Sequence, residues 1–346
     1  MQDASEWKVR PNTHATHFQV LEHGKERCVL IFGHGGPTDT IGTYRIGDGT
    51  APELGQRSAV LVGHPDRVAL ASTTHVPFLA ALGMREAIIA VDRADQVRDS
   101  IVSDRIRRKL VTDLTSGDGL DRERLLQLRP QVLLGDPFQG DALRTIGIPM
   151  VGIAEYLEEH PLGRAEWIRV FGVLFGREAE AERLFAEIAA RYEVAAGKAA
   201  AAPDRPLVFF GSTWQGQWFV PSGTSYMART IADAGGRYAF ADRPSAGNLT
   251  VDVETALAVG ANVHYWGTVL AKEGDVRRSD VAGGDERILR TPAFRNGGVF
   301  AGNSLHADIF GEAVLRPDEV LLDLSGILHP ELKGDRAPVF FRPVAQ

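Results

Sequence analysis

The sequence predicts an α/β protein with two lobes, which are joined by a long helical region and preceded by a small β-rich appendage. Short, continuous apolar runs alternate with helical stretches, a pattern typical of parallel sheets covered on both faces. This alternation stops for a long helical segment after residue 164 and restarts after residue 203. A helix, turn and strand at Glu123–Leu133 have the same layout as residues 254–264, which favours two lobes of related construction.

Residues 1–63 are expected to form the β-rich appendage. Two strand-like runs, Phe18–Leu21 and Arg27–Phe32, flank a hairpin turn in which Gly24 supplies the positive φ that a tight turn needs. The glycine-rich segment Gly33–Gly36 follows. It lacks the lysine and the serine or threonine of a phosphate-binding loop and the spacing of a dinucleotide-binding motif, so a plain loop is expected there.

The first lobe is expected over residues 64–163. Strands are predicted at Arg67–Ser72, Glu86–Asp92, Val132–Gly135 and Met150–Ala154. A helix is expected to follow the first strand and to end at Gly83.

The bridging helical region is expected over 164–202, and the second lobe over 203–346. Apolar residues from Trp167 to Tyr192 recur at helical spacing, with an interruption at Gly176. The part from Arg177 to Ala200 would be about 36 Å long at 1.5 Å per residue. Further on, strands are predicted at Leu207–Gly211, Trp218–Pro221, Asn262–Gly267 and Gly298–Ala301, and a last helix at Leu315–Leu328.

Composition excludes several classes of protein. The 346 residues carry 38 Lys and Arg against 45 Asp and Glu, a net charge of −7, so neither a nucleic-acid-binding surface nor a polybasic membrane patch is expected. Because Cys28 is the single cysteine, no internal disulfide can form, and no zinc site can draw two cysteines from this chain. No apolar run is long enough to span a bilayer. The polar residues 1–6 are unlike a signal peptide, which leaves a cytoplasmic protein or a mature exported one.

No catalytic residue is predicted. The segment around Ser225 lacks the glycine spacing of a hydrolase nucleophile, and no His-Glu-x-x-His motif occurs. An enzyme that uses a cleft between the lobes is kept as an alternative function.

A ligand site is expected in a cleft between the lobes, because loops at the carboxyl ends of parallel strands converge there. The candidate ligand-binding residues lie on such loops, and they are Thr73, Thr74, His75, Arg93, Phe138 and Tyr156 in the first lobe, and Trp214, Gln215, Trp218, Trp266, Asn303 and His306 in the second.

Aromatic residues dominate this candidate set. Three of the five tryptophans, Trp214, Trp218 and Trp266, fall near two loops of the second lobe, with Tyr265 beside them. Flat aromatic faces suit a bulky ligand that is planar or carries catecholates. Alternatively, Tyr265 and Trp266 fill the core of the lobe, as strand aromatics usually do.

Two histidines and two arginines leave the ligand chemistry open. His75 and His306 could coordinate haem iron, bind a bare zinc or manganese ion with an acidic partner, or hydrogen-bond a ligand. For His75, a helix-start residue bonded to the backbone is the alternative. Arg93 and Arg164 could pair with a carboxylate or an anionic chelate, or form surface salt bridges.

From about Pro65 to its C-terminus, the chain resembles the substrate-binding proteins of ABC importers, in the class that has a helical backbone between its lobes. That class carries iron–siderophores, haem and corrinoids. The resemblance rests on an ordered set of segments, at residues 67–79, 123–132, 160–167, 225–228, 233–236 and 314–330. The chain departs from the family at Gln131, where an acidic residue is usual.

The resemblance implies two Rossmann-like lobes joined by a long bridging helix, in a protein that is no enzyme and has no cofactor of its own. It implies a monomer in the periplasm that delivers an iron chelate (siderophore or haem) or a corrinoid to the permease dimer of an ABC importer. The position of Cys28 within a strand-like run favours a soluble form over a lipid-anchored one. Binding of a bare transition-metal ion is the alternative.

Glu123 and Glu254 resemble the two glutamates, one on each lobe, that dock into arginine pockets of the permease in this family. Each opens the helix–turn–strand unit that recurs in this sequence. Alternatively, both are ordinary exposed glutamates that the helix dipole favours in a first turn.

Overall fold

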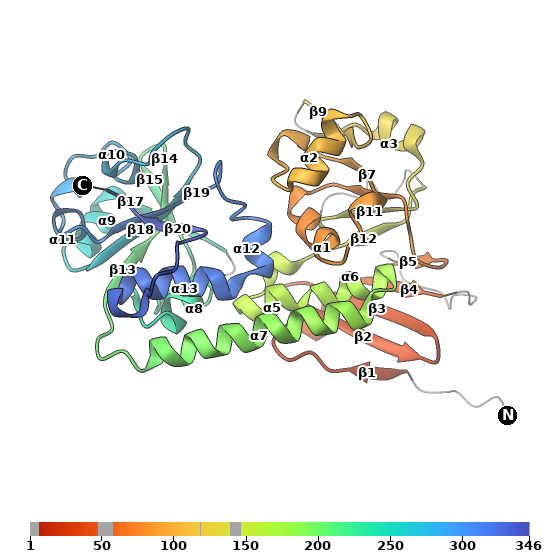
Figure 1. Cartoon of the computed structure of the whole chain (residues 1–346), viewed down its shortest axis with the longest axis horizontal. Coiled ribbons are helices and arrows are strands. Elements are labelled where there is room, and N and C mark those ends of the chain that lie inside the picture. The colour runs from red at the N-terminus through yellow and green to blue at the C-terminus, as the bar shows by residue number, and fades with distance from the viewer. Residues whose placement is uncertain (1–6, 48–57, 118, 139–146, 246, 346) are drawn as a thin grey trace. The chain divides into compact units, whose positions relative to one another are not determined.

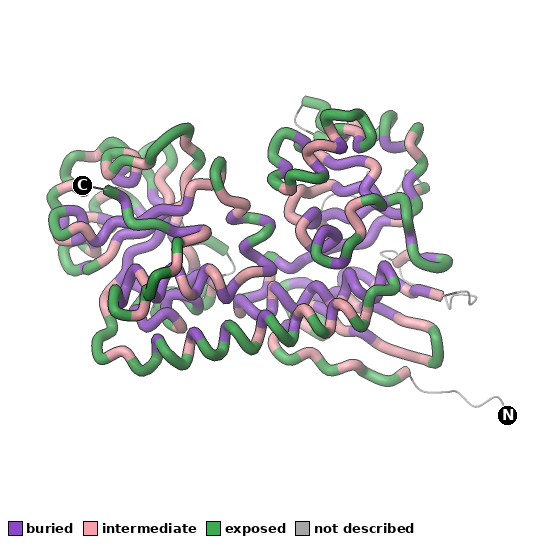
Figure 2. The backbone as a smooth tube through the Cα atoms, in the orientation of Figure 1, coloured by how far each residue is buried: buried purple, intermediate pink, exposed green. Residues whose placement is uncertain are grey.

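The computed structural model describes residues 7–47, 58–117, 119–138, 147–245 and 247–345, so the polar residues 1–6 lie outside the described part. The chain divides into two compact units, the first made of residues 1–158 and 162–186, the second of 159–161 and 187–346. Each contains a mainly parallel sheet with helices, so the predicted α/β class is confirmed (Figure 1). Figure 2 shows buried residues running through the strands of both units.

The N-terminal sheet belongs to the first unit. It orders its five strands as in the sequence, and all neighbours are antiparallel except the last pair. The strands are β1 (Lys8–Arg10), β2 (Phe18–His23), β3 (Glu26–Phe32), β4 (Thr40–Ile46) and β5 (Ser58–Leu61). The predicted hairpin turn is present, with Gly24 at φ 57°, although β2 continues two residues past its predicted end.

Two buried glutamates attach the loop at residues 13–17 to the rest of the first unit. The Glu166 carboxylate, which is 0% exposed, accepts hydrogen bonds from the backbone N–H groups of Thr13, His14 and Ala15, each at 2.7 Å. Glu158 accepts the N–H groups of residues 16 and 17, each at 2.9 Å. Each carboxylate thus satisfies several donors at once, which burial would otherwise leave unpaired.

The first unit also holds a parallel sheet with the strand order β12-β11-β6-β7-β8. The strands are β6 (Val68–Leu70), β7 (Ile88–Val91), β8 (Thr112–Asp113), β11 (Val132–Gly135) and β12 (Met150–Gly152). After β6 the chain adds β7 and β8 on one side, and later β11 and β12 on the other. The strand order therefore reverses between β6 and β11, and loops that diverge at such a point open a crevice at the carboxyl edge.

Helices accompany these strands. They are α1 (Val76–Ala81), α2 (Ser100–Arg107), α3 (Arg122–Leu128), α5 (Pro161–Glu166) and α6 (Ile168–Phe175), and a small hairpin joins β9 (Thr115–Ser116) to β10 (Gly119–Leu120). Every residue of α6 except Arg169 is buried. As predicted, Gly83 follows α1, and Gly176 interrupts the long helical region with φ 64°. Beyond it, α7 (Glu178–Ala200) begins in the first unit and ends in the second.

The second unit has the strand order β16-β13-β18-β19-β20. Its sheet consists of β13 (Leu207–Phe210), β16 (Arg237–Tyr238), β18 (Tyr265–Leu270), β19 (Val299–Asn303) and the antiparallel edge strand β20 (Phe341–Pro343). In this sheet the chain begins with β13, adds β16 on one side and then β18 on the other. The strand order therefore reverses between β13 and β18, as it does between β6 and β11 in the first unit. β18 begins three residues later than predicted, because Asn262 still belongs to the turn after α9 and donates its N–H to the Val259 carbonyl.

A second, three-stranded sheet in this unit consists of β14 (Ser212–Trp214), β15 (Gln217–Val220) and β17 (Leu249–Asp252). The helices are α8 (Tyr226–Asp233), α9 (Val253–Gly260), α10 (Arg278–Val281), α11 (Pro292–Arg295), α12 (Glu312–Leu315) and α13 (Pro317–Leu328). Within the described residues, no helix combines the length and the apolar character needed to cross a membrane.

Candidate functional site

The loop after β6 carries the first group of candidate residues. Ser72 caps the short 3-10 helix Thr73–His75 by accepting a hydrogen bond from the Thr74 N–H. Thr73 and Thr74 are partly exposed, whereas the His75 ring is buried and lies 6.2 Å from the Phe171 ring. The loop therefore leaves two threonines partly exposed, with the Thr74 hydroxyl 2.8 Å from Ser72 Oγ, and buries its imidazole.

His75 and Glu155 form an unusual buried environment. Each is 2% exposed, and neither His75 Nδ1 nor Glu155 Oε2 has a hydrogen-bond partner among the described residues. Burial lowers the pKa of His75 below its ordinary 6.5, and the charges of Glu155 and Asp136 partly oppose this shift. No group of three or more His, Cys, Asp or Glu side chains in the described part of the chain is arranged to hold a metal ion.

The lowered pKa of His75 predicts a pH-dependent stability. In the unfolded chain the imidazole regains its ordinary pKa and binds a proton more readily, so the free energy of unfolding should fall as the pH drops below about 6.5. One proton accounts for at most about 1.4 kcal/mol per pH unit. Urea unfolding between pH 7.5 and 5.5 should show a shallower decline in His75→Gln than in the wild type. Equal slopes would contradict the prediction, and His23→Gln, at a partly exposed site, is the control.

Phe138 and Tyr156 bring aromatic rings to the same edge of the first unit. Asp136, just after β11, accepts hydrogen bonds from the Phe138 N–H at 2.8 Å and from the Tyr156 hydroxyl at 2.9 Å. The rings remain 45% and 44% exposed. Burial of the hydroxyl and its bond to Asp136 raise the pKa of Tyr156 well above its ordinary value, so the phenol stays protonated. Asp136 thus holds two exposed rings in place.

The two arginines considered from the sequence have different surroundings. Arg93 follows β7, has φ 51°, and is exposed, while its N–H donates to Thr115 Oγ1 at 2.8 Å. Arg164 lies on α5 and is half-buried.

In the second unit, a tight hairpin presents Trp214. β14 and β15 pair antiparallel, and the two turn residues, Gln215 and Gly216, both have positive φ, at 49° and 78°. That geometry matches the twist of the strands. Trp214 precedes the turn and is 68% exposed, the largest exposed aromatic surface at a strand end in the described chain.

Trp218 and Trp266 are core residues. They are 2% and 0% exposed, and their rings lie 5.2 Å apart. Trp266 also stacks on Phe209 at 3.8 Å. The interpretation of Trp266 as core filling, which the sequence left open, is therefore the one that the structure shows, and Trp214 alone of the three tryptophans faces solvent.

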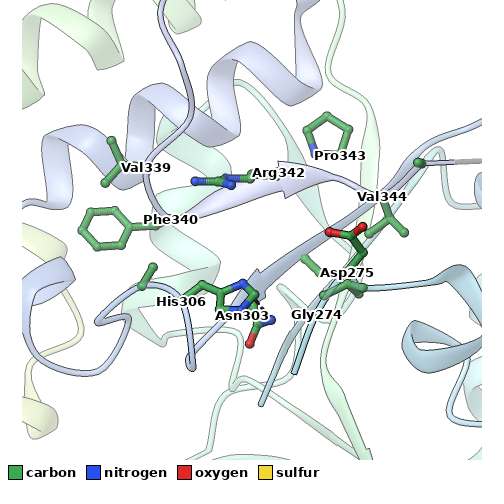
Figure 3. Close-up of a pocket in the computed structure, with 13 residues that line it drawn as sticks. Gly274, Asp275, Asn303, His306, Val339, Phe340, Arg342, Pro343 and Val344 are labelled. Carbon is green, nitrogen blue, oxygen red and sulfur yellow. Dashed lines mark hydrogen bonds between the residues drawn. The ribbon is translucent and has the colours of Figure 1, made fainter. Parts of the chain in front are cut away.

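Asn303 and His306 line a pocket of about 340 Å³ in the second unit (Figure 3). The Asn303 amide bonds both backbone groups of Lys272 and lies 3.4 Å from His306 Nδ1, which orders the loop after β19. The other charged side chains of the pocket are Asp275, from the segment after β18, and Arg342, from β20. The sequence predicted neither as a site residue, and for Arg342 the reason is that nothing in the pattern of residues 339–345 indicates a sheet edge.

Glu123 and Glu254 occupy equivalent positions on α3 and α9. Each lies in the first turn, two residues after an aspartate that caps the helix, Asp121 or Asp252. Both glutamates are exposed, and Glu254 pairs with Arg287 at 2.8 Å. The repeat in the sequence is thus a repeat in local structure.

Comparison with solved structures supports this fold. A periplasmic haem-binding protein from Pseudomonas aeruginosa has a TM-score of 0.64 at 18% identity, with 82% of this chain and 99% of that one covered. The Fe3+-Desferal-bound siderophore-binding protein FhuD from Vibrio cholerae has a TM-score of 0.58 at 18% identity, and the match covers 77% of this chain and 99% of that one. The periplasmic haem-binding protein RhuT from Roseiflexus sp. RS-1 has a TM-score of 0.57 at 21% identity, and the match covers 78% of this chain and all of that one.

Two lipoproteins of Methanocaldococcus jannaschii, both described as uncharacterized, are sequence relatives. They are 29% identical over 237 residues and 25% identical over 240. The alignments cover 67% and 65% of this chain but only 56% and 59% of the relatives, so the chain spans little more than half the length of the curated proteins it matches. The family model for periplasmic binding proteins matches residues 68–304, more than half of the chain. This chain belongs to the periplasmic binding protein family.

Proposed function

We propose that this protein binds a bulky iron chelate (a siderophore or haem) or a corrinoid in the periplasm and delivers it to the permease dimer of an ABC importer. Membership of a family of binding proteins confirms that the chain is not an enzyme. Among the proteins of similar fold, two are named as binding haem and one is a complex with Fe3+-Desferal. The exposed rings of Phe138, Tyr156 and Trp214 at strand ends are the observation that carries the proposal.

Each unit contributes its own proposed ligand surface, and each surface combines exposed rings with a few polar groups. Apolar rings exposed to water gain from contact with a large ligand, while hydroxyl, amide and charged groups fix its orientation. The polar residues we assign to these surfaces are Thr73, Thr74 and Arg93 in the first unit, where His75 is buried, and Gln215, Asn303 and His306 in the second.

Titration of the full chain tests the proposal. Tryptophan fluorescence should change on addition of a ferric siderophore, haemin or cyanocobalamin, because Trp214 is exposed at a strand end. Zinc and manganese salts form a separate arm. Saturable binding of a bare ion without any chelate would favour the alternative function, and binding of none of these compounds would overturn the proposal.

Replacing Trp214 by Ala should weaken ligand binding by about tenfold, the effect of losing one aromatic contact. The melting temperature should stay nearly unchanged, since a side chain that is 68% exposed contributes little to the core. Isothermal titration calorimetry is the suitable measurement, because the substitution removes a fluorophore.

Trp7→Ala is the matched control for Trp214. Trp7 is half-buried before β1, and its ring lies 5.6 Å from that of His23, at the end of β2. Unaltered affinity in Trp214→Ala would remove Trp214 from the ligand surface.

A further inference from the structure

Hydrogen bonds and close glycine contacts restrict the conformation of the loop between β3 and β4 of the N-terminal sheet. The Gly33 N–H donates to the Asp39 carbonyl at 2.8 Å, and His17 Nδ1 lies 3.0 Å from the Gly33 carbonyl. A Cβ on Gly33 would lie 2.3 Å from the Asp39 carboxylate, and one on Gly35 would lie 2.8 Å from Asp39 Cβ. A larger residue at either position would displace the Asp39 side chain, so the two glycines keep the backbone on both sides of His34 on its present course.

The N-terminal sheet contacts the parallel sheet of the first unit where β4 meets β12, two strands of the first unit that Figure 1 labels. The buried Tyr44 of β4 accepts a hydrogen bond from the Gly152 N–H, the last residue of β12, at 2.8 Å. A Cβ on Gly152 would lie 2.7 Å from Pro137 Cβ. The contact therefore joins β4 to the segment that carries Phe138.

The His34 and Phe138 rings stack, with their centroids 5.9 Å apart and their planes 20° from parallel. Both residues are exposed. Asp136 fixes the backbone of Phe138, and the glycine loop fixes His34, so neither ring has to be ordered when a ligand arrives. Together they form a two-ring platform, and one of its rings comes from outside residues 68–304, the part that the family model matches.

We propose that His34 is a specificity-determining residue, and that the His34–Phe138 platform stacks against a flat conjugated ring of the ligand. This inference rests on the proposed function. Aromatic faces gain from offset stacking on another ring system, such as a porphyrin or a catecholate. A hydroxamate chelate or a bare ion offers no such ring. The N-terminal sheet would then bias the protein toward conjugated ligands.

The test compares the wild type with His34→Ala, His34→Phe and the control His23→Ala, all in the full chain. The probes are haemin, a ferric tris-catecholate, ferric desferrioxamine B and cyanocobalamin. For the probe that has a conjugated ring and binds the wild type, His34→Ala should weaken binding about five- to tenfold. His34→Phe, which keeps a stacking ring, should restore most of the affinity, and His23→Ala should have no effect. Melting temperatures should agree within the series.

The outcomes separate this inference from the proposed function. Wild-type protein that binds no probe overturns the proposed function. Wild-type protein that binds only ferric desferrioxamine B, the one probe without a conjugated ring, leaves that function standing and overturns the stacking role. Unchanged affinity of His34→Ala for a ring-bearing probe also overturns the stacking role. Equal losses of affinity in His34→Ala and His34→Phe overturn it too, because they would point to the imidazole nitrogens instead of the ring face.

Discussion

A chain that carries both Glu123→Lys and Glu254→Lys should bind its ligand with unchanged affinity and yet lose transport. Both glutamates are exposed in the first turns of equivalent helices, and neither lies on the strand-end loops that we assign to the ligand. Two anionic anchors match the arginine pockets expected on a permease dimer, and reversing both charges turns attraction into repulsion. Charge pairs at an interface mainly set orientation and encounter rate, so uptake and stimulation of the importer's ATPase should fall by tenfold or more.

Stability should change little in this double variant. A lysine in the first turn opposes the helix dipole at a cost of about 0.3–1 kcal/mol per site. The control reverses two other exposed glutamates, Glu86 and Glu193. Glu86 approaches Arg105 at 3.3 Å, much as Glu254 approaches Arg287, so the control also breaks a surface ion pair. Normal transport by the Glu123 and Glu254 double variant would rule out the docking role.

Glu166→Gln should lower the free energy of unfolding by about 3 kcal/mol. The carboxylate accepts three backbone N–H groups and pairs with Arg169, and an amide of the same shape offers one acceptor and two further donors. Each buried donor left unpaired costs about 1–3 kcal/mol, and Arg169 loses its charge partner. Equilibrium denaturation in urea measures the difference.

Glu193→Gln, at an exposed site on α7, is the control and should be neutral within about 0.5 kcal/mol. Adding Glu158→Gln to Glu166→Gln should cost less than the sum of the single changes, because both carboxylates hold the same loop. A loss below about 1 kcal/mol in Glu166→Gln would show that the 13–17 loop finds other partners.

Much of the fold follows from local signals in the sequence. Apolar runs flanked by glycine located β11 and β13, and Gly176 marked the break before α7. Gln131, the departure from the family pattern, does not alter the fold: its Oε1 accepts the N–H groups of Asp66 and Arg67, at 2.7 and 3.0 Å. A neutral amide oxygen serves these two donors as a carboxylate would.

Other features depend on pairing that no local pattern reveals. In the hairpin of β14 and β15, Trp218 lies opposite Thr213, whereas Trp214 lies opposite Gln217. The two tryptophans thus belong to alternate faces, and which face is buried depends on the packing of the finished sheet. β20 is three residues long and contains Pro343, so its place beside β19, and with it Arg342, comes from tertiary contacts alone.

The hydrogen bonds from the backbone of residues 13–17 to Glu158 and Glu166 also affect how the protein folds during its synthesis. The N-terminal sheet leaves the ribosome before α5, and the carboxylates that hold its loop lie 141–153 residues further along the chain. Contacts so distant in sequence form slowly, because a long loop must close before they contribute. Until α5 has emerged, Phe18 also lacks Trp167, whose ring lies 5.2 Å away in the folded protein. The nascent N-terminal sheet therefore exposes apolar surface until α5 and Trp167 have been translated, and it depends on protection from aggregation for that time.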